Sequence, residues 1–324
     1  MPKAIRIFET GGPEVMKYVD VDVGAPGPDE ARIRHAACGV NFIDVYFRSG
    51  LYPQPLPGGL GMEAAGVVEA VGAGVTHLKP GDRVAYAHRP NGAYSEVRNI
   101  QASVVVKLPD SIDFDTAAAT LLQGMTVEYL FRRTFPLKGG ETVLFHAAAG
   151  GVGLIACQWA RALGVTLIGT VGSDEKGALA KANGCAHIIN YNKENFVDRV
   201  KEITGGAGVP VVYDSVGKDT FTGSLDCLSP LGMMVCFGNT TGPVPAFTLS
   251  ELASRGSLFI TRPALPAYTA KRENLEAMAA ELFAMIENGK IKARINQRFA
   301  LKDAVAAHTA VESRKTTGSS LLVP

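Results

Sequence analysis

Residues 142–163, TVLFHAAAGGVGLIACQWARAL, decide the fold of this chain. The segment begins with an apolar strand pattern over 142–146, turns through small residues, and continues as an apolar helix pattern over 152–163. A strand, a glycine turn and a helix in this order form the context of the dinucleotide fingerprint G-x-G-x-x-G. Ala148 replaces the first glycine of that fingerprint here. The stretch therefore predicts the start of a dinucleotide-binding unit.

The glycine turn supplies the first candidate binding residues. Gly150 lets the backbone approach a pyrophosphate, and Gly153 lets the helix pack closely on the strand. The N-terminus of the helix adds free N–H groups and partial positive charge, which favour a phosphate. We therefore expect a dinucleotide to bind at Ala149, Gly150, Gly151, Val152 and Gly153.

Strand and helix patterns alternate after this stretch, which is typical of a parallel sheet with crossover helices. The expected strands are 142–146, 166–171, 187–190, 211–215, 233–237 and 258–261, and the expected helices are 152–163, 175–183, 195–204 and 220–225. Two further helices, 114–122 and 126–133, come before them. Six such strands predict an α/β fold of the doubly wound Rossmann type.

The two ends of the chain have a different pattern. Up to about Pro109, short strands at 31–37, 64–71 and 83–87 alternate with turns, which predicts an irregular β-rich domain. The C-terminal part adds an amphipathic helix over 272–288, a strand near 295–299, a helix over 301–312 and a last strand over 320–323.

The end of the second strand indicates which nucleotide binds. Binders of NAD place Asp or Glu there, against the ribose 2′-hydroxyl, whereas this chain has Gly172 and Ser173, with Lys176 one turn further on. An acid would repel a 2′-phosphate and a lysine would attract it, so the sequence favours NADPH. Asp174 or Glu175 could supply the acid if the strand ended two residues later. Tyr191 and Arg314 are further candidates for the adenosine end.

Composition excludes several classes of protein. The chain has 324 residues, 32 Lys and Arg against 31 Asp and Glu, and a net charge of +1, so no strong field gathers nucleic acid or anionic lipid. Five cysteines without a C-x-x-C pair favour a reducing, cytoplasmic location over a disulfide framework. The apolar run 143–160 contains glycines and polar residues, so we expect no membrane span.

Eight short motifs along the whole chain carry a family resemblance. They are GGPEV at 11–15, CGVNFIDVY at 38–46, RSGLY at 48–52, GMEAAG at 61–66, PGDRV at 80–84, AAAGGVG at 147–153, YDSVG at 213–217 and TGSSLL at 317–322. With them the chain resembles the zinc-free, ζ-crystallin-like quinone oxidoreductases of the medium-chain dehydrogenase/reductase superfamily. The resemblance implies a GroES-like catalytic domain over 1–123 and 263–324, a Rossmann domain over 124–262, and a homodimer.

Two departures from the zinc-dependent members of that superfamily predict that no metal is bound. A catalytic Zn²⁺ needs three protein ligands. The zinc relatives have a cysteine where this chain has Asn41 and a histidine where it has Met62, and their four-cysteine lobe is absent. Without a Lewis acid, alcohol oxidation is disfavoured, whereas a quinone accepts hydride readily because its product is aromatic.

The resemblance also implies roles for individual residues. Asn41 and Tyr46 would line the cleft between the domains beside the nicotinamide, and Tyr46 is a candidate proton donor. Tyr52, Met62 and Gln123 would contact the substrate. Further expected contacts to the cofactor are Thr126, Ser215, Val216, Phe237, Gly238 and Arg262.

Two alternatives stay open at this point. The same cofactor could reduce an enal, an enone or an enoyl thioester, chemistry that requires a proton at the α-carbon and so makes Tyr46 decisive. Relatives of the ζ-crystallin type also include structural lens proteins and RNA binders, although the near-neutral charge argues against RNA.

Overall fold

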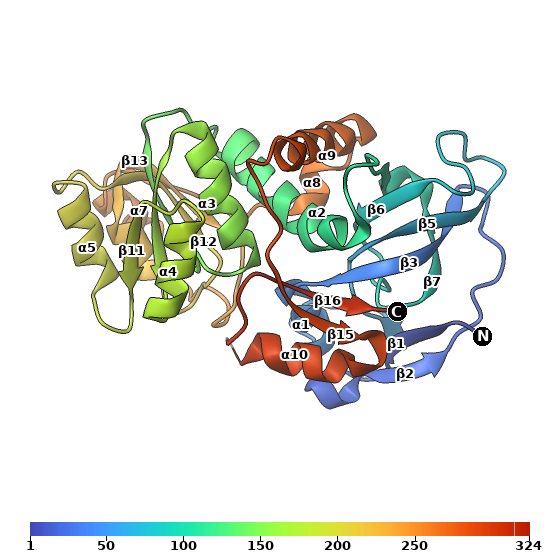
Figure 1. Ribbon diagram of the computed structural model, residues 1–324. Helices are drawn as coiled ribbons and strands as arrows, with labels where there is room; N and C mark the ends of the chain where they lie inside the picture. The colour runs from blue at the N-terminus through green and yellow to red at the C-terminus, as the bar shows by residue number, and fades with distance from the viewer. Residues whose placement is uncertain (314) are drawn as a thin grey trace. The chain divides into compact units, whose positions relative to one another are not determined.

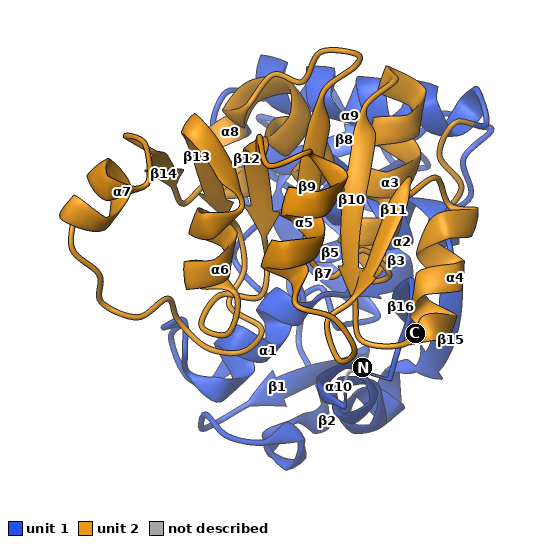
Figure 2. Ribbon diagram, turned by 90° about the vertical axis from the view of Figure 1, so that its left-hand side faces the viewer, with its two compact units in different colours: residues 1–125, 269–289, 293–324 blue, residues 126–268, 290–292 orange. Residues whose placement is uncertain are grey.

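The computed structural model describes residues 1–313 and 315–324, and the chain forms two compact units (Figures 1 and 2). Unit 1 comprises residues 1–125, 269–289 and 293–324, and unit 2 comprises residues 126–268 and 290–292. The candidate residue Arg314 lies outside the described residues.

Unit 2 contains a six-stranded parallel sheet in the order β11-β10-β9-β12-β13-β14. The strands are β9 (Thr142–Phe145), β10 (Thr166–Val171), β11 (His187–Asn190), β12 (Val209–Asp214), β13 (Leu228–Cys236) and β14 (Phe259–Thr261). Numbered along the chain, this order is 3-2-1-4-5-6, which confirms the doubly wound dinucleotide-binding fold. The order reverses between β9 and β12, and ligands of such sheets bind beyond the carboxyl ends of the strands at that point.

Apolar residues on both sides of the sheet hold unit 2 together. Its helices are α3 (Gly151–Leu163), α4 (Asp174–Ala182), α5 (Phe196–Ile203), α6 (Phe221–Asp226), α7 (Ser250–Ser254) and α8 (Leu265–Tyr268). Leu144, Ile168 and Val212 lie on neighbouring strands, are fully buried, and pack in one cluster with Phe221 of α6. Parallel strands that are buried on both faces consist of continuous apolar runs, as these do.

Unit 1 is built around a seven-stranded sheet with the path β15-β16-β3-β5-β6-β8, and β7 also pairs with β3. Its strands are β3 (Glu30–Val40), β5 (Glu63–Val71), β6 (Arg83–Ala87), β7 (Val97–Gln101), β8 (Val105–Lys107), β15 (Ile295–Ala300) and β16 (Ser319–Val323). A smaller sheet consists of β2 (Lys17–Asp20), β1 (Lys3–Ile7) and β4 (Gly58–Gly59). The last strand, β16, pairs antiparallel with β3, so the C-terminal segment completes the sheet that the N-terminal segment begins.

Four helices belong wholly or mainly to unit 1: α1 (Phe42–Ser49), α2 (Phe114–Glu128), α9 (Arg272–Glu287) and α10 (Ala304–Glu312). The prediction of two helices at 114–122 and 126–133 was wrong, because α2 runs through Gly124 without a break and a π-helical segment, η3 (Tyr129–Thr134), follows it. A Cβ on Gly124 would lie 2.4 Å from Leu282 of α9. This glycine therefore allows close helix packing and does not end the helix.

Two other predicted elements differ from the structure. β13 begins at Leu228 instead of residue 233, because Leu228 already pairs with Val209 before the register shifts. On α9, Phe283 is buried, whereas Met285 and Ile286, which the sequence placed on the apolar face, are only half-buried. The remaining predicted strands and helices are present with bounds shifted by a few residues.

Candidate active site

The glycine turn has the geometry of a phosphate cradle. Gly150 has extended backbone geometry at the N-cap of α3, and no side chain among the described residues caps that helix. The first amides of a helix have no partner within it, so those of α3 can bind an anion. A Cβ on Gly153 would lie 2.4 Å from the carbonyl oxygen of Ala147, which explains why only glycine fits there. These features fit the pyrophosphate of a dinucleotide.

Ala147, the first residue of the turn, has a φ of 57°, a left-handed conformation that costs a non-glycine residue about 1–2 kcal/mol. Backbone hydrogen bonds fix the turn around it. The N–H of Ala148 donates to Thr170 O over 3.0 Å, and the N–H of Gly150 donates to Ala147 O over 3.0 Å. The end of β10 therefore holds the turn that follows β9.

The residues after β10 are arranged as a helix start. The strand ends at Val171, and Ser173 is the N-cap of α4, where its Oγ accepts the N–H of Lys176 over 3.3 Å. Asp174 is exposed and accepts hydrogen bonds from Asn190 and Lys193, and both partners lower its carboxyl pKa. Asp174 and Glu175 thus belong to the first turn of α4 and not to the strand end.

Gly172 and Tyr191 lie next to each other beyond the carboxyl ends of β10 and β11. A Cβ on Gly172 would come within 2.6 Å of the Tyr191 hydroxyl oxygen, so the glycine leaves room for that side chain. Tyr191 itself is 49% exposed, and its N–H donates to Val171 O over 3.1 Å. Lys176 is half-buried one turn into α4. These three residues form the adenosine-side candidates within the described chain.

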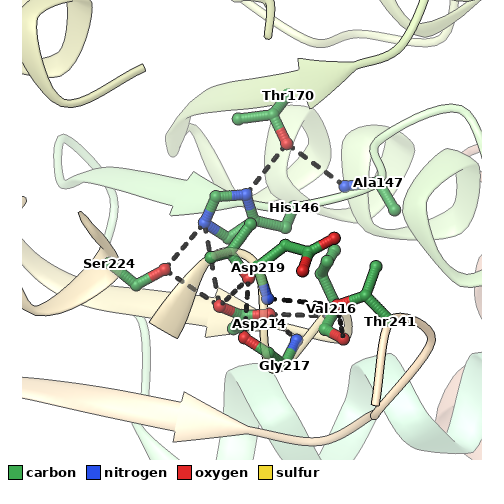
Figure 3. A network of polar contacts seen from close by, with 10 residues as sticks. His146, Ala147, Thr170, Asp214, Val216, Gly217, Asp219, Ser224 and Thr241 are labelled. Carbon is green, nitrogen blue, oxygen red and sulfur yellow. Dashed lines mark hydrogen bonds and ion pairs between the residues drawn. The ribbon is translucent and has the colours of Figure 1, made fainter. Parts of the chain in front are cut away.

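The turn after β12 is held by the carboxylate of Asp214, as Figure 3 shows. Asp214 Oδ1 accepts the N–H of Val216 over 2.7 Å and that of Gly217 over 3.0 Å. The same turn bonds to the residues after β13, because Thr240 and Thr241 donate their N–H groups to the carbonyls of Ser215 and Val216. Two of the expected cofactor residues, Ser215 and Val216, thus lie on a braced turn at the carboxyl end of β12.

The three candidates that follow β13 and β14 also come together. A Cβ on Gly238 would lie 2.4 Å from Ser215 O, so the two strand ends approach each other closely. Phe237 is half-buried, and its ring lies 5.6 Å from that of Phe145. One guanidinium nitrogen of Arg262 donates to the carbonyls of Cys236 and Gly238. Arg262 therefore fixes the backbone of this segment.

In unit 1, Asn41 lies at the centre of a buried polar cluster with Glu63, Gln123 and Ser319, which we call the Asn41 cluster. Asn41 Nδ2 donates to Glu63 Oε2 over 2.7 Å, and Gln123 Nε2 donates to Asn41 Oδ1 over 3.2 Å. Ser319 Oγ donates to Gln123 Oε1 over 3.0 Å, and Glu63 Oε1 accepts the N–H of Leu122 over 2.7 Å. The amide of Asn41 is thus oriented from both of its ends.

Tyr46 lies on α1, the helix that Asn41 caps. Its ring makes edge contacts with Phe42 and Tyr52, with centroid distances of 5.5 and 5.1 Å. Tyr46 and Met62 are buried and Tyr52 is half-buried. Thr126, at the start of unit 2, is buried as well. Two expected substrate contacts, Tyr52 and Gln123, therefore lie in different environments, one aromatic and one polar.

Burial controls the charge of the carboxyl groups near Asn41. Burial raises the pKa of Glu63 to about 8, although the hydrogen bonds from Leu122 and Asn41 oppose the rise. Burial likewise raises the pKa of Asp44 to about 7, and this carboxyl accepts the N–H of Asn41 and the hydroxyl of Tyr94. The two acids can therefore change protonation near neutral pH.

The histidines of unit 1 form hydrogen bonds within the protein, and among them His308 contacts Arg48 and Tyr94. His35 contacts Ser95 O and the Tyr86 hydroxyl, His77 contacts Ala102 O, and His88 contacts Arg89 O. Across residues 1–313 and 315–324, no three His, Cys, Asp or Glu side chains form a group that could hold a metal ion. No helix in that part of the chain is both long and apolar enough to cross a bilayer.

Sequence reasoning did not assign several residues that the structure joins to the candidates. Glu63 lies in the GMEAAG motif and was assigned no role, whereas it orients Asn41. His146, Asp214 and Ser224 were not singled out, yet they form one buried network. An acid or histidine at the end of an apolar strand, as Asp214 and His146 are, is a signal that could have found them.

Comparison with known proteins covers the whole chain. Residues 27–110 match the alcohol dehydrogenase GroES-like domain family, and residues 151–280 match the zinc-binding dehydrogenase family. A quinone oxidoreductase of Pseudomonas aeruginosa is 57% identical over 100% of both chains. A crystal structure of Escherichia coli quinone oxidoreductase complexed with NADPH has a TM-score of 0.98 at 53% identity, over 99% of this chain and 100% of that one. A 2-haloacrylate reductase of a Burkholderia species is 45% identical over 100% of this chain and 99% of its own.

Proposed function

The chain belongs to the quinone oxidoreductase family of the medium-chain dehydrogenase/reductase superfamily, and we propose that it is an enzyme that reduces quinones with NADPH and needs no metal. The observation that carries this proposal is the full-length sequence identity of 53–57% to quinone oxidoreductases, one of which has a crystal structure with NADPH. The GroES-like and Rossmann units of the chain have the family's architecture.

Unit 2 supplies the residues that bind the cofactor. When bound, NADPH supplies the hydride. The uncapped N-terminus of α3 and the turn 149–153 offer amides to the pyrophosphate. Lys176 and the absence of an acid at the end of β10 support NADPH over NADH, because a 2′-phosphate attracts a lysine and repels a carboxylate. Ser215, Val216, Phe237 and Gly238 line the carboxyl ends of β12 and β13, the edge that binds ligands in such sheets.

Unit 1 supplies the residues proposed for the acceptor. Glu63 and Gln123 fix the orientation of the Asn41 amide. Its remaining amide hydrogen is therefore already oriented to donate to an oxygen of the substrate. Tyr46, Tyr52 and Met62 offer apolar surface to a flat ring, and the Tyr46 hydroxyl is a candidate proton donor that an alkene acceptor requires and a quinone does not. Asn41 and Met62 are not zinc ligands, which supports reduction without a metal.

Reduction of an activated alkene is a second candidate function. The similarity to a 2-haloacrylate reductase favours it specifically, because that name describes a polarised carbon–carbon double bond. An alkene acceptor requires a positioned acid for the α-carbon, whereas the oxygen of a reduced quinone can take its proton from water. The effect of removing the Tyr46 hydroxyl therefore distinguishes alkene reduction from quinone reduction.

The acceptor class can be tested by initial rates with NADPH. We expect a higher kcat/KM with 1,4-benzoquinone than with methyl vinyl ketone or 2-chloroacrylate. A higher kcat/KM with either alkene would reject the quinone proposal in favour of the second candidate.

We further propose that the chain acts as a homodimer in the cytoplasm. β14 lies at one end of the strand order in unit 2, so its outer edge offers backbone groups to a second copy. The five cysteines are free and buried, which supports a reducing compartment. Light scattering during size-exclusion chromatography tests the dimer, and a mass of 34.1 kDa, that of one chain, would reject it.

A further inference from the structure

A buried chain of hydrogen bonds joins the ends of three adjacent strands in unit 2 (Figure 3). Thr170 comes from the end of β10, His146 follows β9, and Asp214 ends β12. Ser224 of α6 lies between His146 and Asp214. All four residues are at most 1% exposed. The chain lies where the strand order reverses, the place at which a doubly wound sheet binds its ligand.

The hydrogen atoms of this chain can be assigned from its contacts. Asp214 Oδ2 only accepts, so the Ser224 hydroxyl donates to it over 2.9 Å. His146 Nε2 must then donate to Ser224 Oγ over 2.9 Å. His146 Nδ1 is left as an acceptor for the Thr170 hydroxyl, again over 2.9 Å. Burial lowers the pKa of His146, in agreement with a neutral ring that donates from one nitrogen and accepts at the other.

Each end of this hydrogen-bond network holds a turn of the backbone. At one end, Thr170 Oγ1 accepts the N–H of Ala147, the left-handed residue that begins the glycine turn, over 3.4 Å. At the other end, Asp214 accepts the N–H groups of Val216 and Gly217. The donors between Ala147 and Asp214 therefore point the same way, from the Ala147 amide towards the Asp214 carboxylate. Hydrogen bonds in such a series polarise one another, so the loss of one of them weakens the rest.

The three residue types Ser224, His146 and Asp214 also occur in hydrolytic triads, but this arrangement does not support hydrolysis. The Ser224 hydroxyl donates to the carboxylate instead of to the histidine, whereas a nucleophilic serine gives its proton to the histidine. Ser224 is 0% exposed, so no substrate reaches its oxygen. The network consequently acts through the turns that it holds.

We propose that Thr170, His146, Ser224 and Asp214 are positioning residues that couple the glycine turn 147–153 to the turn 215–217 and thereby set the affinity for NADPH. None of the four side chains needs to touch the nucleotide. The network places two separate sets of backbone amides before binding, which lowers the ordering cost of binding. This inference rests on the proposed use of NADPH.

The test is a set of four variants. Thr170→Val removes the hydroxyl and keeps the shape, Thr170→Ser keeps the hydroxyl, and Ser224→Ala breaks the hydrogen-bond network at a residue of α6, outside the glycine turn. Thr204→Val is the matched control, because Thr204 Oγ1 also accepts a backbone N–H, that of Gly208 over 3.1 Å, at the opposite end of β12. The dissociation constant for NADPH is measured by fluorescence titration, and amide hydrogen exchange is measured without nucleotide.

We expect Thr170→Val and Ser224→Ala to raise the dissociation constant for NADPH about tenfold, and Thr170→Ser and Thr204→Val to leave it near the original value. Exchange of the Ala147 amide should accelerate in Ser224→Ala although Ser224 lies outside that turn, and it should stay unchanged in Thr204→Val. Thermal melts identify variants that are merely unfolded at the temperature of the titration, and Ser224→Ala preserves the test if Thr170→Val does not fold.

The outcomes separate this inference from the proposed function. If the unaltered chain fails to bind NADPH, the proposed function is wrong and the inference falls with it. If the unaltered chain binds NADPH and both Thr170→Val and Ser224→Ala bind it equally well, only the coupling is refuted. An equal loss of affinity in Thr204→Val would also refute it, because the effect would then follow global stability.

Discussion

The two buried carboxylates at the centre of the two candidate regions differ in how many donors surround them. In unit 2, Asp214 accepts four hydrogen bonds, from Val216, Gly217, Thr220 and Ser224. In unit 1, Glu63 accepts hydrogen bonds from Leu122 and Asn41, the backbone of Leu121 also lowers its pKa, and burial outweighs these donors and raises the pKa to about 8. A carboxylate that accepts several donors of one turn holds the backbone of that turn in place, whereas a carboxyl group whose burial outweighs its donors can take up a proton near neutral pH. Asp214 thus anchors a turn of unit 2, whereas Glu63 of unit 1 can change protonation near neutral pH.

The largest effect is expected for Asp214→Ala, which removes the carboxylate that anchors the turn 215–217. The substitution leaves four donors without their acceptor, two of them amides of the turn 215–217. We expect a loss of about 4 kcal/mol in the free energy of unfolding, because the two turn amides lose their acceptor and hydrogen bonds to a charged group are each worth about 1.5–3 kcal/mol. Chemical denaturation with urea measures it. A loss below about 1 kcal/mol would mean that the carboxylate does not anchor this turn.

Glu63→Gln tests whether the buried carboxyl group of unit 1 makes the stability of the protein depend on pH. The carboxyl has an ordinary pKa of 4.5 when unfolded and about 8 when folded, so the folded state binds the extra proton between these values. The contribution of Glu63 to stability is therefore fully present below about pH 4.5 and is lost as the pH rises through about 8.

The neutral glutamine side chain removes that dependence. We expect the melting temperature of Glu63→Gln, relative to the unaltered protein, to rise between about pH 5 and pH 8 and to level off above about pH 8, as thermal melts would record. A constant difference across this range would show that Glu63 does not titrate in the folded state there.

A smaller effect is expected at the adenosine side of unit 2. Lys176→Ala removes the charge proposed to contact the 2′-phosphate and should raise the KM for NADPH about tenfold, with the KM for NADH unchanged. The comparison of the two KM values is its own control, because a general loss of structure would raise both. Equal increases would remove Lys176 from the proposed site.

The smallest effect is expected for Tyr46→Phe, which keeps the ring contacts to Phe42 and Tyr52. If the acceptor is a quinone, kcat should fall less than about tenfold, because water can protonate the product. Loss of a required general acid costs about 10²–10⁴-fold. A fall of that size with 1,4-benzoquinone would make Tyr46 a catalytic acid. It would contradict the proposal that water protonates the reduced quinone.

The sequence predicted the fold well because local patterns determine it. The apolar strands of unit 2 are continuous runs ended by turn residues, and the strand that ends at Val171 was predicted with its correct bounds. The break predicted near Gly124 was wrong, because a glycine that ends a helix and one that allows close packing against Leu282 have the same sequence pattern. Tertiary packing overrode the local signal there.

The polar networks were less accessible to sequence reasoning, because their members are far apart in the chain. His146 and Ser224 are separated by 78 positions, and Gln123 and Ser319 by 196. No local pattern pairs such residues, and hydrogen bonds between them follow only from the tertiary packing of strands and helices. The candidates on the glycine turn, by contrast, are contiguous, so a single motif was enough to nominate them.

The most direct test of the proposed function is steady-state reduction of 1,4-benzoquinone by dialysed protein with a chelator present, driven by NADPH and, in parallel, by NADH. We expect turnover that resists the chelator and has a kcat/KM clearly higher with NADPH than with NADH. Turnover that the chelator abolishes and added Zn²⁺ restores, or a preference for NADH, would contradict the proposed function.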